Sequence, residues 1–532
     1  MLKFILFLMR ILEGSNLLRL AKSKPGLTIG AILLGAVASF SIAPLEIWPC
    51  IIIAYVFFMM QLSCLKTKKG VFFLSLVFFA SNSYLSLTWL NFVMEGFGEL
   101  PAFLSNLVIV LFSIFYIALP YATLNVIAFK ISGKKTEAYL CFFLPLALIG
   151  GDFYVSYVLT GFPWILPGYS CIEGPLKNYA PLFGVRGISA LIYVISGAIA
   201  LTALRKFLYL PLAAAILFIG LFAEGISYTK DLDKKIDVLM VQGNIEQQVR
   251  SQSKSTIEIF SIYWNETKDK IKQDALIIWP ESALPIPFEY QKEFFSNINE
   301  AFNDKGANLI TGLFSLKTDE HKIYNSLVSL GNDKTIDEST IYHKRALVPF
   351  GEIVPFADLL RPLGSIFVIP NSSFNYGEKE QSPIKVHDMQ FTPAICYEAI
   401  FPELIASMDN DKTNGIVMIS NDSWFGPTKA PVQHLNIARM RALELQKPML
   451  RDTNSGITAY IDKFGVVQKT LPSDVEGALE VTFTPAQGQS PYSRFGNTGL
   501  LVIAVLLLSA GIYRLYKKDD ELDEKVTSLV RP

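Results

Sequence analysis

The sequence predicts a multi-pass α-helical membrane domain, with about eight transmembrane helices, joined to one extramembrane α/β domain. Composition is the first reason: 51% of the 532 residues are hydrophobic and only 18% are charged, whereas soluble proteins carry about 25% charged residues. Second, eight apolar stretches are each long enough to cross about 30 Å of hydrocarbon. Third, a block of ordinary soluble composition, roughly 230–490, separates the seventh stretch from the eighth.

The membrane domain is expected over 1–229 and the eighth helix over 491–516, with a cytoplasmic tail at 517–532. The apolar stretches lie near 27–44, 46–64, 71–91, 103–129, 138–158, 184–204, 207–226 and 497–515. The segment LKFILFLMRIL at 2–12 is short, and no cleavage site of small residues follows it. We therefore expect a helix at the cytoplasmic interface there, rather than a cleaved or spanning segment.

Loop charges orient the helices. Lys and Arg gather at 22–24, 66–69, 130–135, 205–206 and 514–518, whereas 45–47 and 92–102 hold none and 159–183 holds only Lys177. This alternation follows the positive-inside rule with a cytoplasmic N-terminus. The soluble block then faces outward, which is the periplasm if the chain lies in a bacterial inner membrane.

The soluble block, 230–490, alternates apolar runs with longer periodic segments. Buried strands are expected at 236–242, 275–280, 307–314, 391–395, 415–420 and 456–461, and helices near 251–272, 288–304, 398–408 and 430–446. Strands and helices in alternation predict a layered α/β domain.

Charge and cysteine usage argue against several function classes. The formal net charge is zero, which disfavours a nucleic-acid partner. The five cysteines form no CxxC pair and the four histidines no HExxH spacing, so we expect neither a disulfide framework nor a metal site. There is no glycine-rich nucleotide loop, and we expect no cofactor.

Three polar segments of the soluble block carry candidate chemistry. WPESALP places Glu281 just after a strand, YHKRALVPFGEIVP holds Lys344 and Glu352, and PAICYEAIFPE places Cys396 between a strand and a helix. A sharp turn would expose the thiol and point a helix N-terminus at it, which favours the thiolate. Taken singly, these residues have plainer interpretations: an inert buried thiol, a capping carboxylate and a solvated lysine.

Together and in this order, WPES, K with LVPFGE, and CYE resemble the nitrilase superfamily with its Glu-Lys-Cys triad. With eight membrane helices around an outward domain, the chain is similar to the apolipoprotein N-acyltransferase family. Other matching motifs are ASFSIAP (38–44), GFPW (161–164), VQGNI (241–245), NDSWFG (421–426), NSGIT (454–458) and YSRFG (492–496). The resemblance covers nearly the whole chain and implies a nitrilase-like α-β-β-α sandwich.

The resemblance implies roles for these residues. Cys396 would be the nucleophile, Glu281 the general base that takes its proton, and Lys344 the cation that stabilises the oxyanion. Glu352 would be a second essential carboxylate that orients Lys344 or the proton path. Lys344 should stay cationic if it lies near both carboxylates.

Supporting roles follow from the same resemblance. Tyr397 and Glu398 come after the nucleophile as in the family, and the backbone N–H of Tyr397 would also face the oxyanion. Trp424 and Trp164 would bind substrate, with Trp164 on a lipid-facing loop. The sequence departs from the family pattern at Glu246 and Ser251, where a Pro and a Trp are common, and at Ala346, where a His is common.

The activity implied is the last step of lipoprotein maturation. Cys396 would take an acyl chain from a phospholipid, typically phosphatidylethanolamine, and pass it to the N-terminal amine of a diacylglyceryl-cysteine apolipoprotein with ping-pong kinetics. We expect a monomer whose partners are these two lipid substrates and the bilayer.

Three alternative functions remain open at this point. One is a membrane-tethered amidase that hydrolyses a small amide. Another is an inert scaffold that binds lipoproteins, although such a protein would be expected to have lost triad residues. The third is a Cys-His-Asn hydrolase that uses His434 and Asn421 with Cys396.

Overall fold

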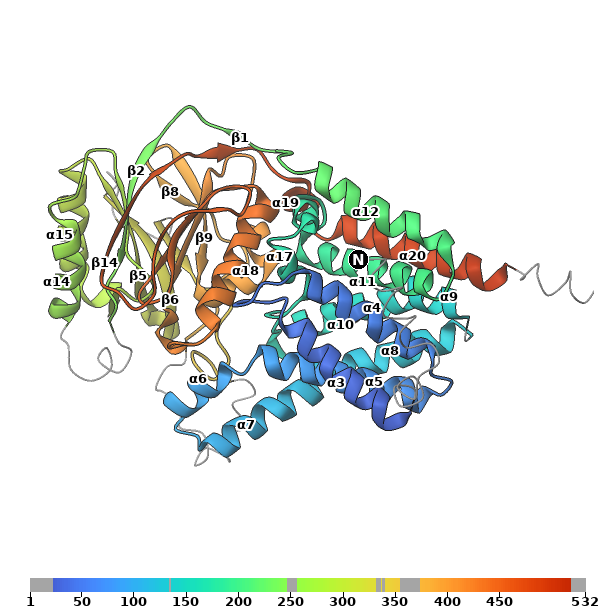
Figure 1. Cartoon of the computed structure of the whole chain (residues 1–532). Coiled ribbons are helices and arrows are strands. Elements are labelled where there is room, and N and C mark those ends of the chain that lie inside the picture. Colours follow the sequence, from blue (N-terminus) through green and yellow to red (C-terminus); the bar gives the residue numbers. More distant parts are fainter. Residues whose placement is uncertain are drawn as a thin grey trace, which may run out of the picture.

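The computed structural model describes residues 23–133, 135–245, 256–331, 336, 340–354 and 374–517. A helical bundle and a β-sandwich meet along one face (Figure 1). The expected interfacial helix at 2–12, the departures at Glu246 and Ser251, and the tail at 518–532 lie outside the described residues.

The helical bundle is formed by the apolar segments that the sequence predicts to be helices. α3 begins with Ser23 as N-cap and a proline in its first turn, which suits a helix start. The longer helices are α3 (Lys24–Ser39), α4 (Pro49–Ser63), α5 (Lys68–Ser86), α6 (Leu90–Gly96), α7 (Ala102–Leu111), α8 (Leu119–Ile131), α10 (Leu144–Tyr157), α11 (Ala180–Ala203), α12 (Leu210–Phe222) and α20 (Thr498–Tyr516). The short or irregular ones are η1 (Phe112–Ala118), α9 (Thr136–Ala138), η2 (Tyr139–Phe143), η3 (Val158–Thr160), η4 (Pro167–Cys171), η5 (Pro175–Tyr179) and η6 (Phe207–Tyr209).

Every predicted apolar stretch coincides with a helical segment, but the count of eight spans is not confirmed. Within the described residues, four helical stretches are long and apolar enough to cross a membrane: Ala102–Ile131, Thr136–Thr160, Pro175–Ala203 and Thr498–Tyr516. α5 and α6 add a fifth if they form one span bent by 59°. The others are shorter: the 16 residues of α3 reach about 24 Å, short of the roughly 30 Å of hydrocarbon.

The sandwich contains two mixed sheets. One has the strand order β14-β2-β3-β5-β6-β7, with β4 paired to β5, and the other has the order β13-β12-β11-β10-β9-β8. The strands of the first sheet are β2 (Ile236–Gln242), β3 (Leu276–Ile278), β4 (Leu284–Pro287), β5 (Asn308–Lys317), β6 (Lys322–Leu330), β7 (Ile341–His343) and β14 (Gly477–Phe483). The second sheet contains β8 (Ile384–Val386), β9 (Met389–Ile395), β10 (Gly415–Ser420), β11 (Met449–Thr453), β12 (Thr458–Ile461) and β13 (Val467–Leu471). A small pair, β1 (Lys230–Asp231) and β15 (Ala486–Gln487), lies apart.

Helices cover both outer faces, which gives the α-β-β-α layers implied by the resemblance (Figure 1). Alternate residues of β2 show why: Val238 and Met240 face the second sheet, whereas Leu239 and Val241 face helices. α14 (Thr256–Thr267) and α15 (Lys292–Asn303) cover the first sheet, and α18 (Ala430–Leu445) covers the second. The remaining short elements are η7 (Phe288–Tyr290), η8 (Thr318–Glu320), η11 (Cys396–Ile400), α17 (Pro402–Ala406), η12 (Asp422–Trp424) and α19 (Pro491–Phe495).

The bundle and the sandwich share one hydrophobic core. Buried residues of membrane helices, such as Tyr55 and Leu191, belong to the same cluster as Ile400 of η11 and Leu443 of α18. α11 contacts α18 directly as well as α4, α10, α12 and α20. The sandwich is therefore packed directly onto the helices.

Candidate active site

Polar residues of the two sheets meet where parallel strands end. Glu281 follows β3 of the first sheet, and Cys396 and Asn421 follow β9 and β10 of the second. The carboxyl ends of neighbouring parallel strands lie at the same edge of a sheet. The backbone N–H of Asn421 joins the two sheets by donating to Glu281 Oε2 at 2.8 Å.

Lys344 is the centre of a buried ion cluster. Its side chain is 1% exposed, and Nζ donates to Glu281 Oε1 at 3.0 Å and to Glu352 Oε1 at 2.9 Å. Burial alone would lower the pKa of Lys344, but the two carboxylates outweigh burial and raise the pKa well above its usual range. Lys344 is thereby held in its charged form.

Asn325, in β6, is a member of this cluster that sequence reasoning missed. Its side-chain Nδ2 donates to Glu281 Oε1 and to Glu352 Oε1, at 2.8 Å each. The residue is 3% exposed, and its Oδ1 has no hydrogen-bond partner among the described residues. Glu352 Oε2 also accepts from the backbone N–H of Val348 at 2.8 Å. The signal in the sequence that could have pointed to Asn325 is a single amide side chain within KIYNSLVSL, the segment that forms β6.

The thiol of Cys396 is buried, not exposed as the sequence suggested. Cys396 is 7% exposed and has a φ of 49°, so it forms a tight left-handed turn after β9. Phe401 is extended because Pro402 follows it, and the expected helix splits into the five-residue η11 and α17.

The expectation of a helix-stabilised thiolate is therefore wrong. Burial raises the pKa of the Cys396 thiol well above its usual range, and the Glu281 carboxylate acts in the same direction. The charge of Lys344 offsets this rise only in part. The resting thiol is neutral, and it lies within electrostatic reach of both groups.

Tyr397 and Glu398 fix the turn that carries Cys396. The Tyr397 hydroxyl donates to the backbone oxygen of Gly161 in the membrane half, at 3.1 Å. Glu398 Oε2 accepts from the backbone N–H of Ile395 at 2.8 Å, and Oε1 accepts from that of Arg345 at 2.6 Å. Glu398 thus connects the turn to the segment that holds Lys344.

The two tryptophans lie at the junction of the halves. Trp164 is 2% exposed, its Nε1 donates to Gln433 Oε1 at 2.8 Å, and its ring stacks on His434 with centroids 5.5 Å apart. The ring therefore turns inward against α18, and the expectation that its loop faces lipid stays a prediction. Trp424 is half-buried, and its ring centroid lies 4.6 Å from that of Phe97.

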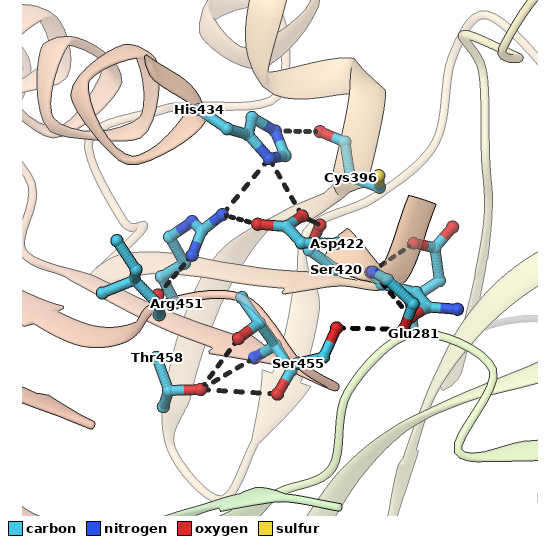
Figure 2. A network of polar contacts seen from close by, with 12 residues as sticks. Glu281, Cys396, Ser420, Asp422, His434, Arg451, Ser455 and Thr458 are labelled. Atoms are coloured by element: carbon cyan, nitrogen blue, oxygen red, sulfur yellow. Dashed lines mark hydrogen bonds and ion pairs between the residues drawn. The ribbon is translucent and has the colours of Figure 1, made fainter. Parts of the chain in front are cut away.

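His434 does not face the thiol. Figure 2 shows the imidazole bonded to the backbone of Cys396: Nε2 lies 3.2 Å from the carbonyl oxygen, and Nδ1 lies 3.1 Å from Asp422 Oδ1. The Asn421 side chain accepts from Asn454 Nδ2 at 3.1 Å. This arrangement does not favour the Cys-His-Asn alternative, in which the imidazole would take a proton from sulfur. Ala346, the third departure from the family pattern, packs against the shared core.

Comparison with known proteins agrees with this architecture. Two family models match in succession: the apolipoprotein N-acyltransferase N-terminal domain over 34–198 and carbon-nitrogen hydrolase over 239–490. The apolipoprotein N-acyltransferase of Shewanella oneidensis is 33% identical over 502 residues, which cover 92% of this chain and 96% of that protein. The proteins of the same name from Vibrio parahaemolyticus (32% identical, 92% and 98% covered) and Haemophilus influenzae (34% identical, 90% and 93% covered) are similarly related. The apolar helices and the sandwich each match a family model, and the relatives cover about nine-tenths of the chain. This chain therefore belongs to the apolipoprotein N-acyltransferase family.

Proposed function

We propose that this chain transfers an acyl chain from a phospholipid, through a thioester on Cys396, to the N-terminal amine of diacylglyceryl-cysteine apolipoproteins. The observation that supports this most directly is the buried Glu281–Lys344 pair within electrostatic reach of the Cys396 thiol. Membership of the family supplies the reaction class. These residues supply a nucleophile, a base and a fixed cation.

In the first half-reaction, Cys396 Sγ attacks the carbonyl carbon of the lipid ester while Glu281 takes the thiol proton. Lys344 and the backbone N–H of Tyr397 stabilise the oxyanion of the tetrahedral intermediate, a contribution of about 10²–10³-fold per donor. The C–O bond to glycerol then breaks. Glu281 returns the proton to the glycerol oxygen, which leaves a lysophospholipid and an acylated Cys396.

In the second half-reaction, the acceptor's α-amine attacks the thioester. Glu281 takes a proton from the attacking nitrogen, the C–S bond breaks, and an amide forms. The departing sulfur of Cys396 recovers the proton. A thioester suits this step because it still reacts readily with an amine.

Burial of the thiol explains why a base is needed at the site. A thiol whose pKa is raised is neutral at physiological pH, so the proton must leave during the attack on the ester. General bases of this kind contribute about 10²–10⁴-fold. Glu352 and Asn325 would hold Glu281 and Lys344 in the positions that this proton transfer requires.

The membrane setting suits two lipid substrates. We propose phosphatidylethanolamine as the donor, and a monomer in the bacterial inner membrane with its catalytic face toward the periplasm. The proposed organisation is a membrane domain at 1–229, a catalytic domain at 230–490 and an eighth span at 491–516. Trp424, Phe425 and Phe401 line the junction of the halves and would hold acyl chains there.

The experiment that tests this proposal follows the acyl group. Purified full-length protein in detergent is incubated with phosphatidylethanolamine and examined by intact-mass spectrometry. We expect an acyl-sized adduct that neutral hydroxylamine releases and that is absent in Cys396→Ala. Cys171→Ala is the matched control, because Cys171 is another buried free thiol, and it should keep the adduct.

A diacylglyceryl peptide with a free N-terminal amine should then take the acyl group, and an N-acetylated peptide should not. Lipid consumption with no adduct on Cys396 would show that the nucleophile is misassigned. If no phospholipid reacts, hydrolysis of a small amide would favour the amidase alternative, and complete inertness would favour the scaffold.

A further inference from the structure

A second buried polar unit lies on the α18 side of the nucleophile turn. Arg451, in β11, donates through Nη2 to Asp422 Oδ2 at 2.7 Å, and Asp422 Oδ1 lies 3.1 Å from Nδ1 of His434. His434 in turn reaches the carbonyl oxygen of Cys396 (Figure 2). Arg451 and His434 are 0% exposed and Asp422 is 2% exposed. None of these three side chains takes part in the acyl-transfer steps above.

The direction of the hydrogen bond to Cys396 follows from its acceptor. A backbone carbonyl can only accept, so Nε2 of His434 carries a proton and donates it. Nδ1 lies between an acceptor, Asp422 Oδ1, and a donor, Arg451 Nη2 at 3.2 Å. A protonated Nδ1 can donate to Asp422 Oδ1, and an Nδ1 without a proton can accept from Arg451 Nη2. In both cases Nε2 keeps its proton and its hydrogen bond to Cys396.

The bond acts on a strained peptide unit. Cys396 occupies the left-handed region, with a φ of 49°, which a non-glycine residue keeps only when its surroundings hold it there. In a trans peptide, the carbonyl of one residue and the N–H of the next point in opposite directions. Fixing the Cys396 carbonyl on His434 therefore fixes the direction of the Tyr397 N–H.

We propose that His434, held by Asp422 and Arg451, is a positioning residue that aims the backbone N–H of Tyr397 at the oxyanion. The inference rests on the proposed acyl transfer at Cys396 and extends it to a group with no access to substrate. It also gives a role to Asp422 of the NDSWFG motif and to His434 of α18, neither of which belongs to the Glu-Lys-Cys triad.

Gly456 of the NSGIT motif supports the same reading. A Cβ at this position would overlap Oδ2 of Asp422. Gly456 does not have a positive φ, so backbone strain is not the reason for glycine here. The close approach of the Asp422 carboxylate is the reason, and alanine would push the carboxylate away from Arg451 and His434.

The test compares two reactions of the same sulfur. Formation of the acyl adduct from phosphatidylethanolamine develops an oxyanion, whereas alkylation of Cys396 by iodoacetamide displaces iodide and does not. For His434→Leu in the full-length protein, we expect kcat for adduct formation to fall by about 10²–10³-fold, the range for one oxyanion donor. KM and the alkylation rate of Cys396, read by peptide mass spectrometry, should stay close to wild type.

Three further variants make the test specific. His434→Gln keeps an N–H donor near the position of Nε2 and should recover most of the lost rate. Gly456→Ala removes no polar group and should lower kcat in the same way. Asn436→Leu, a buried polar position on the same helix that bonds to Glu46 and Arg439 instead, is the matched control and should keep kcat.

The outcomes separate this inference from the function on which it rests. If the wild type forms no adduct, the acyl-transfer proposal fails first. If the wild type forms the adduct and His434→Leu forms it equally fast, the positioning role is refuted. Equal losses of acylation and alkylation would also overturn it, since they would indicate a collapsed turn. If His434→Leu does not fold, Gly456→Ala decides by the same comparison.

Discussion

Replacing Asn325 with leucine tests whether the amide holds the two carboxylates of the cluster in place. Asn325 Nδ2 is the one donor besides Lys344 that reaches both Glu281 and Glu352 in the described part of the chain. Without it, two carboxylates share a single ammonium group, and they would separate by repulsion. Glu281 would then leave the position from which, in the proposed mechanism, it takes the thiol proton.

The contacts give the size of the effect. Each hydrogen bond to a charged acceptor contributes about 1.5–3 kcal/mol, so two bonds contribute about 3–6 kcal/mol. Leucine also removes the buried Oδ1 that lacks a partner among the described residues, which returns about 1–3 kcal/mol. The net loss of stability lies between about 0 and 5 kcal/mol, with a central value of about 2.5 kcal/mol. A displacement of Glu281 by about 1 Å would slow acylation by roughly 100-fold.

The assay is the rate of acyl-adduct formation on Cys396, with a thermal melt of each protein. Asn308→Leu is the matched control: Asn308 is a buried amide at the other end of the β5–β6 pair, where its Nδ2 donates to the backbone oxygen of Leu330 at 3.2 Å. It should lose stability but keep the acylation rate. Equal acylation rates in the two variants would refute the reasoning.

Four other perturbations, two of substitution alone and two of pH, have expected outcomes. Lys344→Met removes the cation that offsets burial, so the pKa of the Cys396 thiol should rise further and its alkylation at pH 8, measured by peptide mass spectrometry, should slow; an unchanged rate would contradict this. In the wild type the same alkylation should still be rising at pH 9.5, whereas free cysteine levels off above its pKa of about 8.5; an early plateau would show an ordinary thiol. Burial lowers the pKa of His343 to about 4, whereas the unfolded chain binds this proton at about pH 6.5. Stability should therefore fall as pH drops from about 6.5 to 4, and melts of His343→Gln should fall less over that range; parallel curves would exclude His343 as the cause. Gly161 has a φ of 81°, and a Cβ there would overlap a backbone oxygen, so Gly161→Ala should lower the melting temperature and slow acylation by disturbing the acceptor of the Tyr397 hydroxyl. A wild-type acylation rate in that variant would show that the contact is dispensable.

The strands predicted from the sequence are buried ones, although β6 and β11 are buried too and were missed because polar residues interrupt their apolar runs. The runs at 236–242 and 415–420 match β2 and β10 residue for residue, because a strand covered on both faces is a continuous apolar run. β13, with the sequence VQKTL and mostly exposed side chains, gives no such signal. The helix expected near 398–408 failed for a local reason, since Pro402 forces Phe401 out of the helical conformation.

The candidate site was predictable only in part. Glu281, Lys344 and Cys396 stand in recognisable segments, but nothing near Asn325 in the sequence indicates that two carboxylates meet there. Exposure of the Cys396 thiol could not be inferred either, because its burial depends on how the surrounding elements pack. Long-range packing decides both, and a single sequence does not encode it in a local pattern.

The contact between α17 and α20 has a consequence for the order of synthesis. Glu403, two residues into the short helix that follows the Cys396 turn, bonds to Arg186 of α11 and to Asn497 at the start of α20. A ribosome makes α11 before the two sheets and residue 497 after them. The turn that carries the thiol is thus held on one side by a helix made before the sandwich, and on the other by a segment made after it. A nascent chain can build both sheets before that moment, but the contacts that hold the Cys396 turn are complete only when α20 enters the bundle.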